Sequence, residues 1–181
     1  MAAQRAMSRL GPGELTLADI AGEAGVTAGA LVQRFGSKRG LLLALAGRFS
    51  GGTAEMFGAL RKGRRSPLAT LRAYADCMAE MSSSPEAFAR NFAYLQIDLT
   101  DPDFRQHMSK SARATRAELQ QLLVEAIEQG ELSAGTNPRQ LARTVEAVIG
   151  GSMLSWAFHQ EGPAAKWIRH DLDAVLKPYV T

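Results

Sequence analysis

The side chains that could perform acid–base, nucleophilic or metal chemistry are scattered in this sequence. Its three histidines, His107, His159 and His170, fall in three different predicted helices and lack the spacing of metal ligands. Cys77 is the single cysteine, and it lies on an apolar stripe with no histidine near it in the sequence. Such a position is typical of a buried structural thiol rather than of a nucleophile.

Three carboxylates, Asp98, Asp101 and Asp103, cluster where one predicted helix ends and the next begins. Capping of the helix ends explains them better than acid–base catalysis does. The glycine pairs 51–52 and 150–151 fall inside helical patterns, so neither predicts a loop that binds phosphate. The sequence therefore predicts that the protein is not an enzyme, with no catalytic residues, no metal site and no cofactor.

Basic residues are concentrated in the first third of the chain. Residues 1–65 hold 10 Lys or Arg against 4 Asp or Glu, whereas residues 66–181 hold 11 against 14. A basic segment joined to a mildly acidic body suggests nucleic acid as a partner at one end, although a cationic face can also serve only for solubility. The uneven division argues against an architectural DNA protein, which would be basic along its whole length.

Length and composition are those of an ordinary globular protein. With 181 residues, 46% of them hydrophobic and 22% charged, the chain can bury a sizeable core. No apolar run is long enough to span a membrane, and the first residues lack the apolar stretch of a secretory signal. A lone cysteine suits a reducing compartment, so we expect a cytoplasmic protein with no membrane partner.

Helical periodicity runs through nearly the whole chain, and no segment combines two-residue alternation with flanking turns. The predicted fold class is therefore all-α. A capping residue precedes proline at four typical helix starts: Ser66-Pro67, Ser84-Pro85, Asp101-Pro102 and Asn137-Pro138. About nine helices are expected, over residues 4–10, 17–24, 28–35, 38–62, 67–81, 85–99, 102–129, 138–160 and 164–179.

Between residues 16 and 45 the sequence predicts two short helices joined by a sharp turn. Gly25 can adopt the left-handed conformation of such a turn, Val26 is expected to fill the corner, and Thr27 to cap the second helix. The second helix would bury Leu31 and Phe35 and turn its other face outward. This geometry suits a protein that binds the DNA major groove, although a helical hairpin that only packs is the simpler alternative.

The residues of this segment favour DNA binding. The stretch TLADIAGEAGVTAGALVQRFGSKRGLL, residues 16–42, resembles the DNA-binding signature of the TetR family. The shared pattern is a Thr, Ile-Ala, Ala-Gly-Val, a Ser or Thr, an aromatic Phe, then Ser-Lys and Leu. The resemblance implies a three-helix helix-turn-helix DNA-binding domain in residues 1–47 and a helical ligand-binding and dimerisation domain in residues 48–181.

The same resemblance implies which residues bind double-stranded operator DNA. Threonines at helix N-termini and the lysine that opens the next helix would bind phosphates, and small residues would let the backbone approach the duplex. Gln33 and Arg34 are the best placed for contacts with bases or phosphates. The predicted DNA-binding residues are Thr16, Thr27, Ala28, Gly29, Ala30, Gln33, Arg34 and Lys38.

Two departures from the family pattern concern the strength of DNA binding. Val32 stands where members usually carry a tyrosine, so one stacking and phosphate contact is missing. The first predicted helix is also shorter than is usual in the family. We therefore expect either a trimmed N-terminus or a weaker grip on DNA.

Residues 50–130 are rich in methionine and aromatic side chains at helical spacing. Such a stripe usually fills a core, but the resemblance implies an apolar cavity for a small-molecule effector, with a few polar anchors. The predicted ligand-binding residues are Met56, Leu60, Tyr74, Cys77, Met78, Met81, Phe88, Asn91, Phe92, Leu95, Met108, Arg113 and Trp156.

The last two predicted helices carry faces that suit a homodimer. Ala147, Gly151 and Ser155 recur every four residues, which lets another helix approach closely, and the final helix has a clean apolar stripe. Packing within one chain is the alternative. The predicted interface comprises Ala147, Val148, Gly151, Ser155, Ile168, Leu172 and Val175.

Taken together, these features predict a ligand-responsive transcriptional regulator that acts as a repressor. It would bind a palindromic operator as a homodimer and release it when a small, mostly apolar effector binds. The alternative is an all-α small-molecule binding protein without a DNA-binding role.

Overall fold

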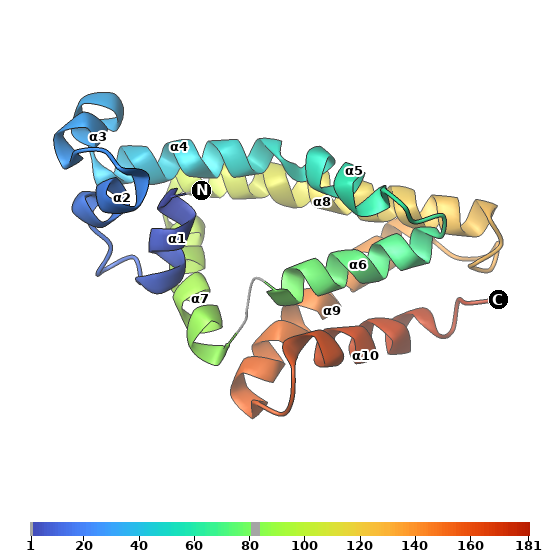
Figure 1. Cartoon of the computed structure of the whole chain (residues 1–181). Helices are drawn as coiled ribbons and strands as arrows, with labels where there is room; N and C mark the ends of the chain where they lie inside the picture. Colours follow the sequence, from blue (N-terminus) through green and yellow to red (C-terminus); the bar gives the residue numbers. More distant parts are fainter. Residues whose placement is uncertain (1, 81–83) are drawn as a thin grey trace. The chain divides into compact units, whose positions relative to one another are not determined.

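A computed structural model describes residues 2–80 and 84–181, and most of that length is helical (Figure 1). The described part holds ten helices and a single isolated bridge between Leu132 and Val180, so the all-α prediction is confirmed. The helices are α1 (Ala2–Arg9), α2 (Leu17–Ala24), α3 (Ala28–Phe35), α4 (Lys38–Gly51), α5 (Thr53–Arg61), α6 (Pro67–Glu80), α7 (Pro85–Thr100), α8 (Pro102–Glu128), α9 (Pro138–His159) and α10 (Ala164–Leu176).

Four of these helices begin at the prolines that the sequence marked as helix starts. In α6, α8 and α9 the side chain before the proline accepts a hydrogen bond from a free backbone amide at the helix start. Ser66 Oγ accepts from the amide of Ala69 at 3.0 Å, and Asn137 Oδ1 accepts from that of Gln140 at 3.1 Å. An oxygen of Asp101 accepts from the amide of Asp103 at 3.0 Å.

The prediction of one helix over residues 38–62 is wrong, because the helix breaks at Gly52. Two successive glycines each disfavour a helix by about 1 kcal/mol relative to alanine. The hydroxyl of Ser50 also donates to the carbonyl oxygen of Gly47 at 2.9 Å, a local contact that competes with regular helix hydrogen bonds. The chain therefore ends α4 at Gly51 and starts α5 at the buried Thr53.

The chain divides into two compact units that are not continuous in sequence. The first unit contains Met1–Gly52 and Glu86–Ser111, and the second contains Thr53–Pro85 and Ala112–Thr181. Helix α8 begins in the first unit and ends in the second. This division follows packing, whereas the predicted domains 1–47 and 48–181 divide the chain by function.

The first unit is built on the packing of successive short helices. Helix α1 packs on α2, α2 on α3, and α3 on α4 (Figure 1). One apolar cluster joins these helices to the start of α8, and its buried members are Ala6, Leu15, Ile20, Ala21, Leu31, Leu41, Leu42 and Phe104. Helix α3 is therefore held from one side only, since Leu31 is its buried residue.

The second unit has its core between α6, α9 and α10. Helix α10 packs on both α6 and α9, and the side chains of Ile168, Leu172 and Leu176 are fully buried between them. The prediction that Ile168 and Leu172 lie at a dimer interface is wrong for that reason. Both side chains already fill the core of their own chain and are not available to a partner.

Within the described residues, we find no helix with the length and apolar character that crossing a membrane requires.

Candidate nucleic-acid interface

Helix α2 has a fixed start, because Thr16 and Asp19 cap it reciprocally. Thr16 Oγ1 accepts from the amide of Asp19 at 3.2 Å, and Asp19 Oδ2 accepts from the amide of Thr16 at 2.8 Å. Hydrogen bonds from the side chain and the backbone of Thr16 lower the pKa of Asp19, so its carboxylate stays charged. This capping box orients the helix that supports α3.

The turn between α2 and α3 forms as the sequence predicted at two of its three residues. Gly25 has a φ of 66°, the left-handed conformation, and Thr27 Oγ1 accepts from the amide of Ala30 at 3.2 Å. Val26 does not fill the corner, since 46% of it is exposed. Its amide donates to the carbonyl oxygen of Ala21 at 3.0 Å, which holds the backbone of the turn without the side chain.

Helix α3 has one face toward the protein and one toward solvent. Leu31 is buried and Phe35 is partly buried, whereas Gln33 and Arg34 are exposed. Gly29 and Ala30 are exposed on the same helix, and Ala28 is partly buried. The structure thus turns Gln33 and Arg34 outward, as DNA binding requires, and their contact with bases stays a prediction.

Several cations of the first unit have partners within the protein. The Nζ of Lys38 donates to the carbonyl oxygens of Pro12 and Leu15, at 3.0 and 2.8 Å. This use of the ammonium ties the segment before α2 to the start of α4 and competes with the predicted phosphate contact. Arg5 and Arg9 both pair with Glu23, each at 3.0 Å, which joins α1 to α2.

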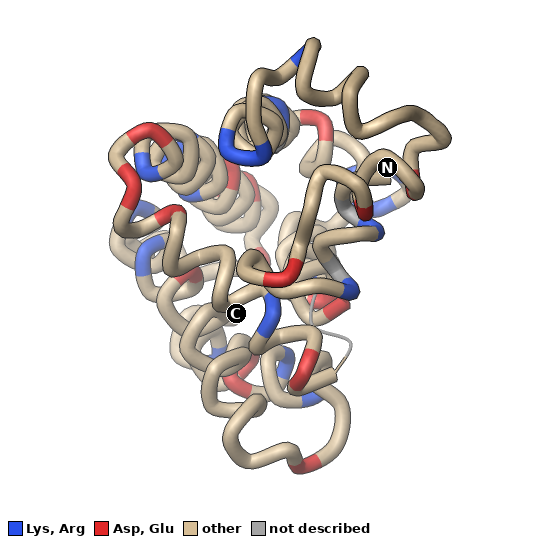
Figure 2. Tube along the Cα trace, turned by 90° about the vertical axis from the view of Figure 1, so that its left-hand side faces the viewer, with Lys and Arg blue, Asp and Glu red and all other residues tan. Residues whose placement is uncertain are grey.

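Arg34 differs from these cations. Its guanidinium lies 5.3 Å from the centre of the Phe35 ring, and it has no acidic partner in the part of the chain that the structure describes. Figure 2 shows basic and acidic positions intermingled along the trace. The guanidinium of Arg34 is therefore better suited to contact DNA than those of Arg5 and Arg9, which form ion pairs with Glu23.

Gly40 is a structural requirement that the sequence analysis missed. A Cβ atom built at this position would collide with the carbonyl oxygen of Phe35, the last residue of α3. The obstructing atom belongs to the backbone, so it cannot move without shifting α3. A lone glycine in the first turn of a predicted helix, where alanine would be favoured, was the signal available in the sequence.

Arg39 is a second missed residue, and it holds the start of α4. Its Nε and Nη2 donate to the two carboxylate oxygens of Asp101, at 3.0 and 2.9 Å, and Nη2 also donates to Asp103 at 2.7 Å. The guanidinium also lies 5.7 Å from the centre of the Phe104 ring. Both carboxylates were predicted to cap helix ends, and Asp101 both caps α8 and pairs with Arg39.

The pKa of Asp101 reflects this pairing. Partial desolvation would raise it, but the hydrogen bond from Arg39 and those from two backbone amides outweigh that effect and lower the pKa. The carboxylate therefore stays charged beside Arg39. The turn between α7 and α8 is fixed to the first turn of α4, and only two residues separate α4 from the end of α3.

The predicted ligand-binding residues do not gather in one compact unit. Tyr74 and Trp156 are core residues of the second unit: Tyr74 stacks on Phe57, and the indole of Trp156 donates to the carbonyl oxygen of Gly162 at 2.9 Å. Burial, with the charges of Glu146 and Cys77, raises the pKa of Tyr74 to about 12. The second unit also contains five more of the predicted ligand-binding residues: Met56, Leu60, Cys77, Met78 and the exposed Arg113.

The remaining members belong to the first unit, except for Met81, which lies outside the described residues. Phe88 and Leu95 are partly buried, and Asn91, Phe92 and Met108 are exposed. These side chains share a residue type and a helical spacing, and neither property indicates which unit a helix belongs to.

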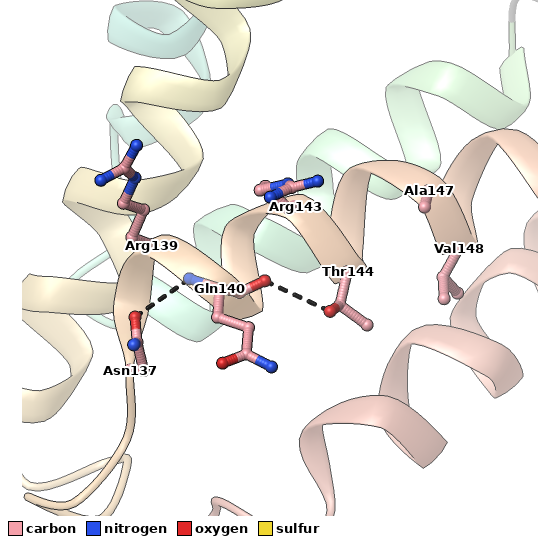
Figure 3. A pocket seen from close by; sticks show the side chains of 7 residues that line it. All are labelled: Asn137, Arg139, Gln140, Arg143, Thr144, Ala147 and Val148. Atoms are coloured by element: carbon pink, nitrogen blue, oxygen red, sulfur yellow. Dashed lines mark hydrogen bonds between the residues drawn. The ribbon is translucent and has the colours of Figure 1, made fainter.

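Helix α9 presents an exposed face on the second unit. Ala147 and Gly151 are exposed, and Val148 and Ser155 are partly buried, as is Val175 of α10. A surface pocket of about 620 Å³ lies along the first half of α9. Figure 3 labels the residues that line it, from Asn137 to Val148. Two large apolar side chains extend the exposed face toward the end of the helix: Leu154, 38% exposed, and Phe158, 79% exposed.

Two family models match the chain. Residues 1–45 match the model of bacterial regulatory proteins of the tetR family, and residues 67–172 match that of a tetracyclin repressor-like C-terminal domain. Together they cover the helix-turn-helix and most of the second unit. No curated protein matches the chain.

Solved structures share the fold over nearly the whole chain. A TetR transcription regulator from Haloarcula marismortui is 17% identical, with a TM-score of 0.77, covering 99% of this chain and 95% of that one. SmeT, the repressor of a Stenotrophomonas maltophilia multidrug efflux pump, is 24% identical, with a TM-score of 0.66 and coverage of 99% and 87%. FadR from Bacillus subtilis, in complex with stearoyl-CoA, is 18% identical, with a TM-score of 0.71 and coverage of 96% and 94%.

Proposed function

The chain belongs to the tetR family of bacterial regulatory proteins, and from this premise we propose that it is a ligand-responsive transcriptional repressor. It binds a palindromic operator as a homodimer, in the cytoplasm. The observation that carries this proposal is the outward face of α3, where Gln33 and Arg34 are exposed and Arg34 has no acidic partner among the described residues. An all-α carrier without a DNA-binding role is not favoured, since it has no use for such a helix.

The proposed contacts follow from the chemistry of the α3 side chains. Arg34 can donate two hydrogen bonds to a guanine in the major groove, and Gln33 can make a bidentate pair with an adenine. Gly29 and Ala30 leave room for the backbone beside the duplex. Ala28, in the first turn of α3, and the threonines that cap α2 and α3 lie at helix N-termini, where free amides attract phosphate.

Lys38 has a positioning role in this proposal. Two of its ammonium hydrogens are directed at the carbonyl oxygens of Pro12 and Leu15, so it orders the segment before α2. Arg39 holds the same first turn of α4 through its ion pairs with Asp101 and Asp103. Both residues act on DNA binding through the orientation of α3.

Dimerisation is proposed to use the exposed face of α9. Ala147, Gly151, Leu154 and Phe158 are spaced by three or four residues, so they lie along one side of the helix. In a two-fold dimer the same face of both subunits meets, and small residues let the helices approach closely. Paired α3 helices then meet operator half-sites about 34–36 Å apart, or a multiple of that distance.

Residues 48–181 are proposed to bind the effector and residues 1–47 to bind DNA. The similarity in fold to FadR, whose structure holds stearoyl-CoA, supports a mostly apolar effector for this chain. Effector binding favours a conformer in which the recognition helices no longer match the half-sites. A coupling of about 1–3 kcal/mol would weaken DNA binding roughly 5- to 150-fold.

Selection of DNA fragments bound by the purified protein tests the proposal. We expect the wild-type chain to enrich a palindrome from a random library, and the variant Gln33→Ala/Arg34→Ala to enrich none while keeping its helical circular dichroism. Arg65→Ala, which removes an exposed arginine between α5 and α6, serves as the charge-matched control and should enrich the same site. Failure of the folded wild-type chain to enrich any sequence would refute the proposal.

A further inference from the structure

The first unit contains a small cavity that neither the DNA-binding surface nor the dimer face uses. Its volume is about 100 Å³. Side chains from four helices line it: Met7 of α1, three residues of α4, three of α7 and two of α8. All of them belong to the first unit, so the cavity is built within one compact body.

Most of the cavity wall is apolar or polarisable. Leu42, Leu45, Ala46 and Ile97 contribute aliphatic surface. Two methionines add flexible thioethers, which adapt to the shape of a bound molecule. A compact hydrocarbon group would be favoured in such a cavity, because binding removes apolar surface from water.

Two aromatic rings, those of Tyr94 and Phe104, also line the cavity. Aromatic faces attract cations as well as apolar groups. The hydroxyl of Tyr94 donates to the carbonyl oxygen of Leu10 at 2.9 Å, and burial raises the pKa of this phenol to about 12. The phenol is therefore neutral and held in place, and its hydrogen is already used.

Asp98 is the charged residue of the cavity wall. In the part of the chain that the structure describes it has neither an ion pair nor a hydrogen bond, unlike Asp101 and Asp103, which lie one turn further on and pair with Arg39. Burial raises the pKa of Asp98 above the usual value of an aspartate. A partly buried carboxylate without a partner gains from a cation that supplies both charge and hydrogen-bond donors.

We propose that this cavity is a binding site for a small organic cation with a compact apolar body, such as a short branched amine. The ammonium would donate to Asp98, and the hydrocarbon would lie among the aliphatic and aromatic side chains. The size of the cavity limits the ligand, because a cavity of about 150 Å³ holds a benzene molecule. At about 100 Å³, two-thirds of that volume, the site admits a body of about four carbon atoms.

Methyl NMR with labelled methionine tests this proposal with isobutylammonium chloride as the probe. Met7 and Met108 line the cavity and report on its occupancy, whereas Met153 lies in the second unit, is not among the predicted effector-binding residues and serves as the internal control. Isobutanol, a neutral molecule of the same shape, separates the charge from the hydrocarbon. Ammonium chloride at equal concentration controls for salt.

We expect isobutylammonium to shift the Met7 and Met108 signals saturably and to leave the control signal in place. Asp98→Asn keeps the shape of the side chain and removes its charge, and it should weaken amine binding by about tenfold or more, the usual effect of losing a charged hydrogen-bond partner. Binding of isobutanol should be weaker and should not depend on this substitution. Ala46→Leu, which fills the cavity, should abolish binding of both.

Three results would overturn the proposal: no saturable shift of the two reporters, an equal shift at the control methionine, or equal amine affinity in Asp98→Asn. The methyl spectra themselves report whether each variant is folded. Any effect of the amine on operator affinity would rest on the proposed function, because Leu42, Leu45 and Ala46 belong to α4. The titration is made without DNA, so its failure and a failure of DNA binding are distinguishable.

Discussion

Helices α3 and α10 both carry an apolar stripe in the sequence, and they use it differently. In α3 a single buried leucine anchors the helix, and the opposite face, with Gln33 and Arg34, is exposed. In α10, Ile168, Leu172 and Leu176 have no exposed surface and lie between α6 and α9, whereas Val175 is partly buried. An apolar stripe therefore shows only that one side of a helix is buried. It does not show whether the residues that bury it belong to the same chain or to a partner.

The difference lies in the residues around each stripe. Helix α3 is surrounded by residues with specific conformational roles, such as Thr16, Gly25 and Thr27, and these predict one arrangement. Helix α10 has only periodicity, and its first residue follows Pro163 without a side-chain cap. If α3 is a DNA-binding surface and α10 a core element, substitutions in and around the two helices should have different effects.

Leu172→Ala should have the largest effect on stability. Removal of a fully buried leucine side chain costs about 2–5 kcal/mol in the free energy of unfolding, because it leaves a cavity. Urea denaturation followed by circular dichroism measures this loss. Val175→Ala, one turn later and partly buried, is the matched control and should lose less. An unchanged midpoint in Leu172→Ala would mean that α10 does not hold the core of its own chain.

Gly40→Ala should disturb α3 without touching its DNA-binding face. The new methyl group meets the carbonyl oxygen of Phe35, so α3 must shift, at a cost of about 1–3 kcal/mol in stability. We expect the free energy of operator binding to fall by more than the free energy of unfolding. Fluorescence anisotropy measures the binding, and thermal denaturation measures the stability. Gly58→Ala in α5 is the control, since its Cβ would meet no atom within 4 Å. That variant should be slightly more stable and bind DNA normally.

Leu154→Glu separates the exposed face of α9 from the buried face of α10. A carboxylate placed at the centre of the proposed interface would be desolvated without a partner, so the dimer should weaken by at least about tenfold. Sedimentation analysis should find folded monomers. Glu substituted at Ala174, an exposed position of α10, should leave the dimer intact. A Leu154→Glu variant that remains a dimer would place the interface elsewhere.

Arg39→Gln should have the smallest effect, because its ion pairs are exposed to solvent. We expect a modest loss of operator affinity and little change in stability. The pKa of Asp101 is lowered in the folded protein, so the contribution of this pair is present above the unfolded pKa and is lost as the pH falls through the lowered value. The acid denaturation of wild type and Arg39→Gln should therefore converge at low pH. Acid denaturation curves of the two proteins that stay parallel would exclude a contribution of the Arg39–Asp101 pair to stability.

The sequence predicted the helices, their proline starts and the outward face of α3, because each depends on residues within a few positions of one another. Gly40 and Arg39 were missed because their roles depend on atoms that only the fold brings close, the carbonyl oxygen of Phe35 and the carboxylates near residue 101. Lys38 was assigned to phosphate since its carbonyl partners lie more than 20 residues away. The break at Gly52 was overlooked because apolar residues continue on both sides of it.

The central claim is that Arg34, on the exposed face of α3, contacts DNA and that Arg65, an exposed arginine outside α3, does not. Anisotropy titrations of the selected operator and of unrelated DNA with wild type, Arg34→Ala and Arg65→Ala test it directly. The account predicts that Arg34→Ala loses about 1–3 kcal/mol of operator binding, while Arg65→Ala matches wild type. Equal operator affinity of wild type and a folded Arg34→Ala protein would contradict the account.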